Sequence, residues 1–183
     1  MATAYLVFHA SVNPVTAQHF MATCANLLNQ GNNELYLCLS TPGGEVASGI
    51  TIYNFLRGLP IKVITHNIGN IDSIGNAIFL AGEMRRASQH STFMFHGVGF
   101  DIKSQMRIEE KNLREMMDAM SADHKRMADI IADRTTLSFD EARQLFTEAR
   151  TKNADDALNA GVVHEVADLA IPPGAPVTTL VLT

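Results

Sequence analysis

Two side chains in this sequence, the hydroxyl of Ser73 and the imidazole of His96, could together carry out nucleophilic catalysis. Ser73 stands between a glycine-containing loop and Gly75, at the start of a predicted apolar helix. A serine in this place either caps the helix by accepting a main-chain N–H, or presents a nucleophile at a tight turn where the helix N-terminus stabilises negative charge. Ser73 alone leaves both interpretations open.

His96 ends the apolar run TFMFH, which predicts a strand. It is either a hydrogen-bonded core histidine or a general base that takes the Ser73 proton on one ring nitrogen. The pair Gly43–Gly44 fits a turn that needs positive φ. It equally allows a main-chain N–H to approach a developing oxyanion, with the N–H of Ile74 as the second donor.

The elements expected around these residues alternate between strands and helices. Strands are predicted at 5–8, 34–40, 61–65, 85–89 and 92–96, and helices at 14–30, 46–56 and 73–81. This alternation predicts βαβ units and an α/β fold with a mainly parallel sheet. The loops 41–44, 69–75 and 95–97 each follow a strand, so we expect all three at one edge of the sheet, where ligands usually bind.

A charged segment without proline or glycine, 104–133, predicts one long helix. Its apolar residues form a heptad-like seam that Glu110 and His124 interrupt; the seam consists of Met106, Leu113, Met117, Met120, Met127 and Ile131. This helix either packs on its own domain or projects and packs on a neighbouring subunit, because ~45 Å of helix is longer than a small domain needs.

The remaining segments predict shorter elements. A helix starts near Ser138 with a sequence that resembles a capping box, and a short helix over 154–159 stops before Gly161. We expect 162–166 to be the last strand, and the tail beyond it, with prolines between 172 and 176, to be irregular.

Composition bounds the class of protein. The 183 residues suit one domain, and 46% hydrophobic with 18% charged residues is globular composition. A net charge of −5 argues against nucleic acid or an anionic membrane as the main partner. No apolar run is long enough to span a bilayer, and no secretory signal is visible.

The two cysteines, Cys24 and Cys38, fit neither a metal site nor a disulfide framework. We expect both to be reduced and buried, as in a cytoplasmic protein. The nucleophilic chemistry outlined above needs no metal and no cofactor, so none is predicted.

Together these segments resemble the ClpP family, the proteolytic subunits of the Clp protease, within the wider ClpP/crotonase group. LSTPGG at 39–44 resembles the family's NSPGG loop, and GNIDSIGNAIFLAG at 69–82 resembles its GxAxSMGAxLLxAG nucleophile segment. The other matching segments are the strand ending at His96, the handle helix at 104–133 and the closing EAxxYGLxD segment at 157–166. The resemblance covers roughly residues 4–167.

The resemblance implies a ClpP/crotonase-like ββα superhelix in one domain over 1–183. Its head would comprise about 1–100 and 135–167, its projecting handle helix about 104–133, and its tail 168–183. It also implies a homo-oligomer of stacked rings that hydrolyses peptides or unfolded proteins inside a chamber.

Carried over by position, the resemblance implies a serine endopeptidase in which Ser73 is the nucleophile that forms the acyl-enzyme and His96 is the general base. Gly44 and Ile74 would donate the oxyanion-hole N–H groups. The segments after Gly44 and after His96 would clamp an extended peptide by strand addition.

Three features depart from the family pattern. The family's catalytic aspartate aligns with Ala149, so the third member of the triad is unassigned. Either a nearby acid substitutes for it or the site works as a Ser–His dyad; the candidate acids are Asp101, Glu148, Asp155 and Asp156. Gly97–Val98 replaces the family's Gln-Pro after the histidine. An ATPase unfoldase partner stays open, because no counterpart of the N-terminal helix and axial loops that contact the ATPase precedes the first strand.

Two other functions fit the same residues. Ala149 favours a catalytically weak or inactive ring component that serves assembly or regulation. A crotonase-like acyl-CoA enzyme would use the glycine-loop N–H groups to hold a thioester enolate, but such enzymes usually carry a carboxylate at the catalytic position and have a longer chain.

Overall fold

The computed structural model describes residues 2–99 and 108–180. Its strands are β1 (Thr3–His9), β2 (Glu34–Thr41), β3 (Lys62–Asp72), β4 (Met84–Ala87), β5 (Thr92–Met94), β6 (Thr151–Asn153), β7 (Glu165–Val166) and β8 (Val177–Thr179). Its helices are α1 (Pro14–Asn29), α2 (Val46–Arg57), α3 (Gly75–Leu80), α4 (Glu110–Arg134), α5 (Phe139–Glu148) and α6 (Ala154–Asn159).

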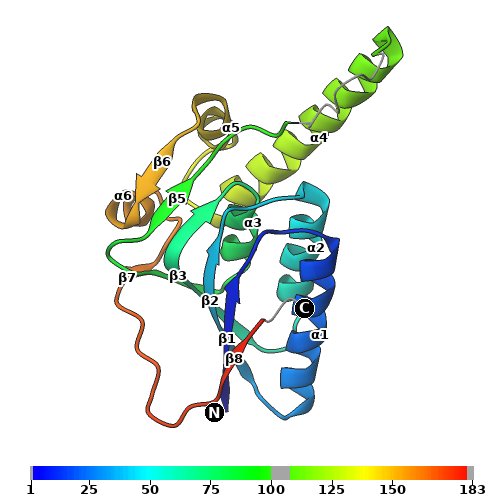
Figure 1. The fold of residues 1–183 in the computed structure, drawn as a ribbon. Helices are drawn as coiled ribbons and strands as arrows, with labels where there is room; N and C mark the ends of the chain where they lie inside the picture. The colour runs from blue at the N-terminus through cyan, green and yellow to red at the C-terminus, as the bar shows by residue number, and fades with distance from the viewer. Residues whose placement is uncertain (1, 100–107, 181–183) are drawn as a thin grey trace.

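One sheet organises the described part of the chain. The strands follow the order β6-β5-β3-β2-β1-β8, and β4 pairs with β3 and β7. Every pairing is parallel except that of β5 with β6. Helices α1 and α2 lie side by side along one face of the sheet (Figure 1). The predicted α/β fold with a mainly parallel sheet is therefore confirmed.

Strand β2 lies at the centre of the core and is buried on both faces. Leu35, Leu37 and Leu39 point into the large apolar cluster beneath the helices. Tyr36 and Cys38 belong to a smaller cluster on the opposite face. Two-sided burial is typical of strands in parallel sheets.

The tail of the chain is largely irregular, as its prolines indicate, but it contains one short strand that was not expected. Strand β7 is not the last strand, because β8 pairs in parallel with β1 beyond it. Leu169, Ile171 and Ala175 pack against the smaller cluster on the way. The tail thus covers one face of the sheet and the free edge of β1, which would otherwise expose unpaired main-chain groups.

The strand that leads to Ser73 is longer than its sequence indicates. We expected a loop at 69–72, but β3 continues through Asp72: it pairs with β2 as far as Ile71, and it pairs first with β4 and then with β5. The helix after it starts at Gly75 rather than at Ser73. Strand β5 ends at Met94, two residues before His96, although the N–H of Phe95 still donates to the carbonyl of Arg150.

Helix α4 projects from the rest of the chain (Figure 1). It begins at Glu110; of the expected start, 104–107 lie outside the described residues and 108–109 precede the helix. Met127 and Ile131 are buried against the head, whereas Leu113 and Met117 are 50% and 65% exposed. Its C-terminal half therefore packs on its own domain, and its N-terminal half does not.

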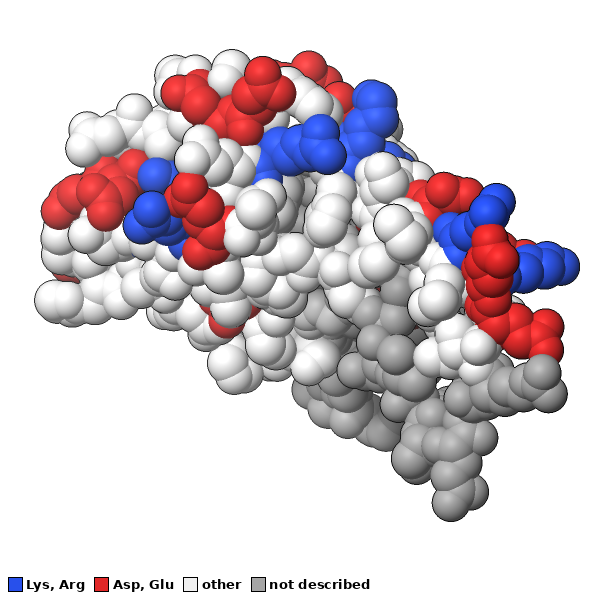
Figure 2. All heavy atoms as spheres, turned by 90° about the horizontal axis from the view of Figure 1, so that it is seen from above, with Lys and Arg blue, Asp and Glu red and all other residues white. Residues whose placement is uncertain are grey.

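Acidic and basic side chains alternate on the projecting helix (Figure 2). Glu110 pairs with Arg114, and Lys111 with Glu115, one helical turn apart. Such exposed pairs add only a few tenths of a kcal/mol each. None of the described helices is long and apolar enough to cross a membrane.

Candidate active site

Ser73 adopts a strained main-chain conformation at the turn between β3 and α3. Its φ is 57°, a left-handed value uncommon for residues other than glycine. Its N–H donates to the carbonyl of Met94 at 2.9 Å, and its own carbonyl accepts from the N–H of Asn76 at 3.1 Å. Strain of this kind is found at functional sites, where the surrounding structure maintains it.

The hydroxyl of Ser73 does not cap the following helix. Ile74 is the N-cap of α3, and this helix has no side-chain cap bond. Among the described residues, the structure records no hydrogen bond of the Ser73 hydroxyl to any group. The capping interpretation is therefore wrong, and the hydroxyl is available for other chemistry.

The glycine pair allows the preceding loop to pass directly against Ser73. A Cβ on Gly43, whose φ is 82°, would lie 2.6 Å from the carbonyl oxygen of Asp72 and 2.7 Å from the Cβ of Ser73. A Cβ on Gly44 would lie 2.1 Å from the carbonyl oxygen of Val12. Both positions therefore exclude any other residue in this loop conformation.

Two main-chain N–H groups near Ser73 keep their donor capacity. Val12 holds the glycine loop through two bonds of 2.8 Å, to the carbonyl of Gly43 and from the N–H of Glu45. Within the described ranges, neither the N–H of Gly44 nor that of Ile74 donates to a recorded acceptor. Free donors flanking a nucleophile can stabilise an oxyanion.

The ring of His96 is held in one tautomer. Its Nδ1 lies 2.9 Å from the carbonyl oxygen of Gly97. Because a carbonyl oxygen only accepts hydrogen bonds, Nδ1 carries the proton and Nε2 of the neutral ring keeps its lone pair. This is the tautomer that a histidine needs in order to accept a proton from serine.

Three of the four predicted site residues line one hollow. Gly44, Ser73 and His96 border a space of about 700 Å3. Ile74, the fourth, is fully buried and is not among the residues that line the hollow. Among the described residues, no hydrogen bond joins the Ser73 hydroxyl to the His96 ring. Catalytic hydrogen bonds often tighten only when substrate binds, so this geometry is compatible with a resting enzyme.

Ala149 is the C-cap of α5, with a φ of 50°, and lies just before the β5–β6 pairing begins. The antiparallel register joins Met94 to Thr151, and the bond from Phe95 to Arg150 continues it. Continued one step beyond the two strands, this register would bring His96 opposite Ala149. Opposed residues in an antiparallel pair have Cβ atoms about 5 Å apart. The methyl side chain of Ala149 brings no charge to this place.

None of the described acids proposed as substitutes lines the hollow. Glu148 bonds Arg150 and Gln144, and these two partners hold the pKa of its carboxyl below the usual range. Asp155 lies 3.4 Å from the amide of Gln89. The fourth substitute, Asp101, lies outside the described residues.

Asp156 faces away from the site as well. Its N–H is capped by Asn153 at the start of α6. Together with Glu148 it borders a separate hollow between α5 and α6. Among the described residues, no carboxylate bonds Nδ1 of His96, and its one recorded partner is the carbonyl of Gly97.

Helix α4 contributes two residues to the site that the sequence reasoning missed. Asp123 lines the hollow together with Ser73 and His96. His124 accepts the N–H of Val98 on Nε2 at 2.7 Å. The only signal for either residue was the interruption of the apolar seam at position 124. In the part of the chain that the structure describes, no group of three or more His, Cys, Asp or Glu residues could hold a metal ion.

Comparison with known proteins places this arrangement in context. A family model described as Clp protease matches residues 2–170. Proteins named ATP-dependent Clp protease proteolytic subunit 2 are similar to the chain. The one from Prochlorococcus marinus is 27% identical over 162 residues, which cover 85% of this chain and 76% of the relative. The one from Corynebacterium glutamicum is 26% identical over 163 residues, which cover 82% and 76%.

A solved structure shows the same fold. A ClpP1 mutant from Listeria monocytogenes superposes with a TM-score of 0.76, and the match covers 91% of each chain. The two sequences are 19% identical, so this likeness concerns the fold alone. It confirms the ClpP-like architecture that the sequence motifs predict.

Proposed function

This chain belongs to the Clp protease family, and on that premise we propose that it is a serine peptidase with Ser73 as its nucleophile. The observation that carries the proposal is the strained turn at Ser73, which leaves its hydroxyl without a recorded partner in the hollow that His96 also lines. Similarity to relatives named as Clp protease proteolytic subunits supports the same reaction class.

The reaction follows from the properties of these groups. Nε2 of His96 takes the proton of the Ser73 hydroxyl as its oxygen attacks the peptide carbonyl. The N–H groups of Gly44 and Ile74 stabilise the oxyanion, and losing one such donor typically costs ~100-fold in turnover. His96 then gives the proton to the leaving amine, and water activated by the same ring hydrolyses the acyl ester.

The hollow also has main-chain segments on which an extended peptide can lie. Glu45–Ala47 and Gly97–Gly99 both contribute to its lining. We expect a substrate to add as a strand against these segments, with its scissile bond beside Ser73.

Slow turnover is the second part of the proposal. The carbonyl of Gly97 orients the His96 ring, but it carries no full charge to stabilise the imidazolium that forms during the reaction. Ala149 supplies none either. We therefore propose a Ser–His dyad that is weaker than a complete triad. A catalytically silent ring component is the alternative that Ala149 favours.

Assembly is proposed from the projecting half of α4. Leu113 and Met117 are exposed there and form an apolar stripe between charged neighbours. We propose that a second copy of this chain covers the stripe in a homo-oligomer of stacked rings. The head, handle helix and tail would then form a single domain in each copy.

Hydrolysis of short fluorogenic peptides by the purified protein tests the proposal. We expect slow cleavage that disappears in Ser73→Ala and in His96→Ala, with peptide hydrolysis unchanged in His90→Ala, an exposed histidine outside the hollow. Cleavage that persists in Ser73→Ala would overturn the assignment. Assembled protein with no cleavage at all would support the silent ring component instead.

A further inference from the structure

His124 connects helix α4 to the segment that holds the proposed general base. Its Nε2 accepts the N–H of Val98 at 2.7 Å, so this nitrogen is unprotonated and the ring is neutral. The ring is stacked on Phe146, with centroids 6.1 Å apart and planes 17° apart. A Cβ on Gly97 would lie 3.3 Å from the same Nε2, so the imidazole is packed directly on the Gly97–Val98 segment.

This segment carries the carbonyl that sets the tautomer of His96. The main chain is fixed before it, where Phe95 donates to the carbonyl of Arg150 at 2.8 Å. It is fixed after it where Val98 donates to His124. The carbonyl of Gly97, which accepts from Nδ1 of His96, lies between these two points. The position of that carbonyl therefore depends on the bond to His124.

Residues 97 and 98 of this sequence make the position of the Gly97 carbonyl depend on the bond to His124. A proline at position 98 would have no N–H to donate, whereas valine supplies a donor that needs a partner. Glycine at position 97 adds main-chain freedom that an external contact must restrict. The structure records no bond from a described carboxylate to Nδ1 of His96, and the carbonyl of Gly97 is its recorded orienting partner.

Resting on the function proposed above, we propose that His124 is a positioning residue for His96 and that protonation of His124 lowers the reactivity of Ser73. An imidazolium carries a proton on both ring nitrogens and cannot accept the N–H of Val98. The Val98 N–H then faces another donor, and the Gly97 carbonyl loses its fixed position. The His96 ring is then free to rotate, and Nδ1 loses the acceptor that keeps the proton on that nitrogen.

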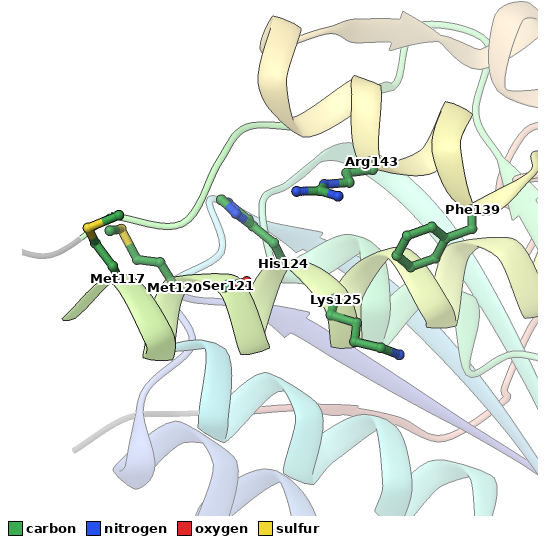
Figure 3. Close-up of a pocket in the computed structure, with 7 residues that line it drawn as sticks. All are labelled: Met117, Met120, Ser121, His124, Lys125, Phe139 and Arg143. Carbon is green, nitrogen blue, oxygen red and sulfur yellow. The ribbon is translucent and has the colours of Figure 1, made fainter. Parts of the chain in front are cut away.

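Charged side chains border the cavity that His124 lines. Arg143 of α5 and Lys125 of α4 line the same cavity of about 470 Å3, and Figure 3 shows Arg143 reaching toward the His124 ring. Lys125 is paired with Asp129, and Asp123, the neighbour of His124 in the chain, is paired with Arg126. Phe146, Gly97 and Val98 carry no charge.

Two matched variants separate positioning from packing. In His124→Gln an amide oxygen can accept the N–H of Val98 but does not titrate. In His124→Phe the ring remains on Phe146 but the acceptor is lost. His90→Gln removes an exposed histidine elsewhere and serves as the control. Thermal melting of each variant shows whether the fold is kept.

The readout is the rate at which a fluorophosphonate labels Ser73, measured between about pH 5.5 and 8, the range in which histidines titrate. Near pH 8 we expect a fluorophosphonate to label His124→Phe about five- to tenfold more slowly than the wild type, which is the factor for one lost hydrogen bond. The glutamine variant should react faster than the phenylalanine variant. As the pH falls, the ratio of the glutamine variant's rate to that of the wild type should rise, because only the wild type loses the bond.

The possible results are distinguishable. Equal rates and parallel pH profiles in the wild type and both folded variants would overturn the role of His124 while leaving the peptidase proposal intact. If both variants unfold, Val98→Pro, which removes the N–H that His124 accepts, replaces them. Labelling of folded Val98→Pro as fast as that of the wild type, with a parallel pH profile, would overturn the role of His124. Absence of labelling in every protein, wild type included, would instead contradict the proposed function itself.

Discussion

Placing a carboxylate opposite the proposed base should accelerate the reaction. In Ala149→Asp we expect the new side chain to lie across from His96, because the β5–β6 register, continued past Phe95 and Arg150, pairs these two positions with Cβ atoms about 5 Å apart. The main chain tolerates the change, because Ala149 has a φ of 50° and aspartate is among the residues that best adopt left-handed values. The substitution therefore adds charge without a new demand on the fold.

The size of the effect follows from Coulomb's law. Two unit charges about 5 Å apart interact by ~3 kcal/mol at an effective dielectric constant of ~20. Because Ala149 is exposed, solvent reduces this to ~1–1.5 kcal/mol, which corresponds to about a tenfold gain in the acylation rate. The carboxylate also favours the imidazolium, so the midpoint of the rate–pH profile should move to higher pH.

The assay compares Ala149→Asp with Ala149→Asn by peptide hydrolysis and by fluorophosphonate labelling of Ser73. Asparagine has nearly the same shape and the same tolerance of positive φ, but it carries no charge. We expect the aspartate variant to be about tenfold faster than the asparagine variant. Equal rates in the two variants, or an unmoved pH profile, would show that position 149 does not face His96 as the register indicates.

Further predictions concern the turn and the core. In Gly43→Ala the new Cβ would meet the carbonyl of Asp72 at 2.6 Å, so we expect more than tenfold slower labelling of the serine and a loss of ~1–3 kcal/mol in a urea titration; unchanged labelling would refute the close approach. Burial raises the pKa of the Cys24 thiol to about 12 and that of Cys38 to about 11. Iodoacetamide should therefore modify both thiols in urea and neither in the native protein, and rapid native modification would contradict their burial. Burial lowers the pKa of His66 below its ordinary value of 6.5, so the unfolded chain binds the proton more readily and unfolding free energy should fall as the pH drops below about 6.5. Urea titrations at two pH values should show a smaller drop in His66→Gln, and an equal drop would count against this cause.

Much of the fold is readable from the sequence because its signals are local. The apolar spacing of Phe20, Cys24 and Leu27 predicts α1, and all three are buried. The capping box at Ser138 and Glu141 starts α5 as expected. Gly161, with a φ of 67°, follows the end of α6 as predicted. These features depend on neighbours within a few residues, so a single sequence reveals them.

The features that the sequence did not reveal depend on contacts between distant segments. Strand β3 runs through Asn67 and Asn70, polar residues typical of loops, because Asn67 bonds the carbonyl of Thr92 and Asn70 bonds Ser40. The short strand β8 has too few residues to show alternation, and β1 stabilises it by pairing.

The candidate site was only partly predictable for the same reason. The motifs named Ser73, His96 and the glycine pair, and the structure gathers them in one hollow. The left-handed conformation of Ser73 and the bond between His96 and Gly97 are set by packing, which no motif describes. The contribution of α4 through His124 joins segments 26 residues apart and has no pattern of its own.

Mass spectrometric mapping of the residue that a fluorophosphonate modifies tests the central claim most directly. The account predicts one adduct, on the peptide that contains Ser73, which is lost in Ser73→Ala and forms far more slowly in His96→Ala. An adduct on another serine, or none on assembled and folded protein, would contradict it.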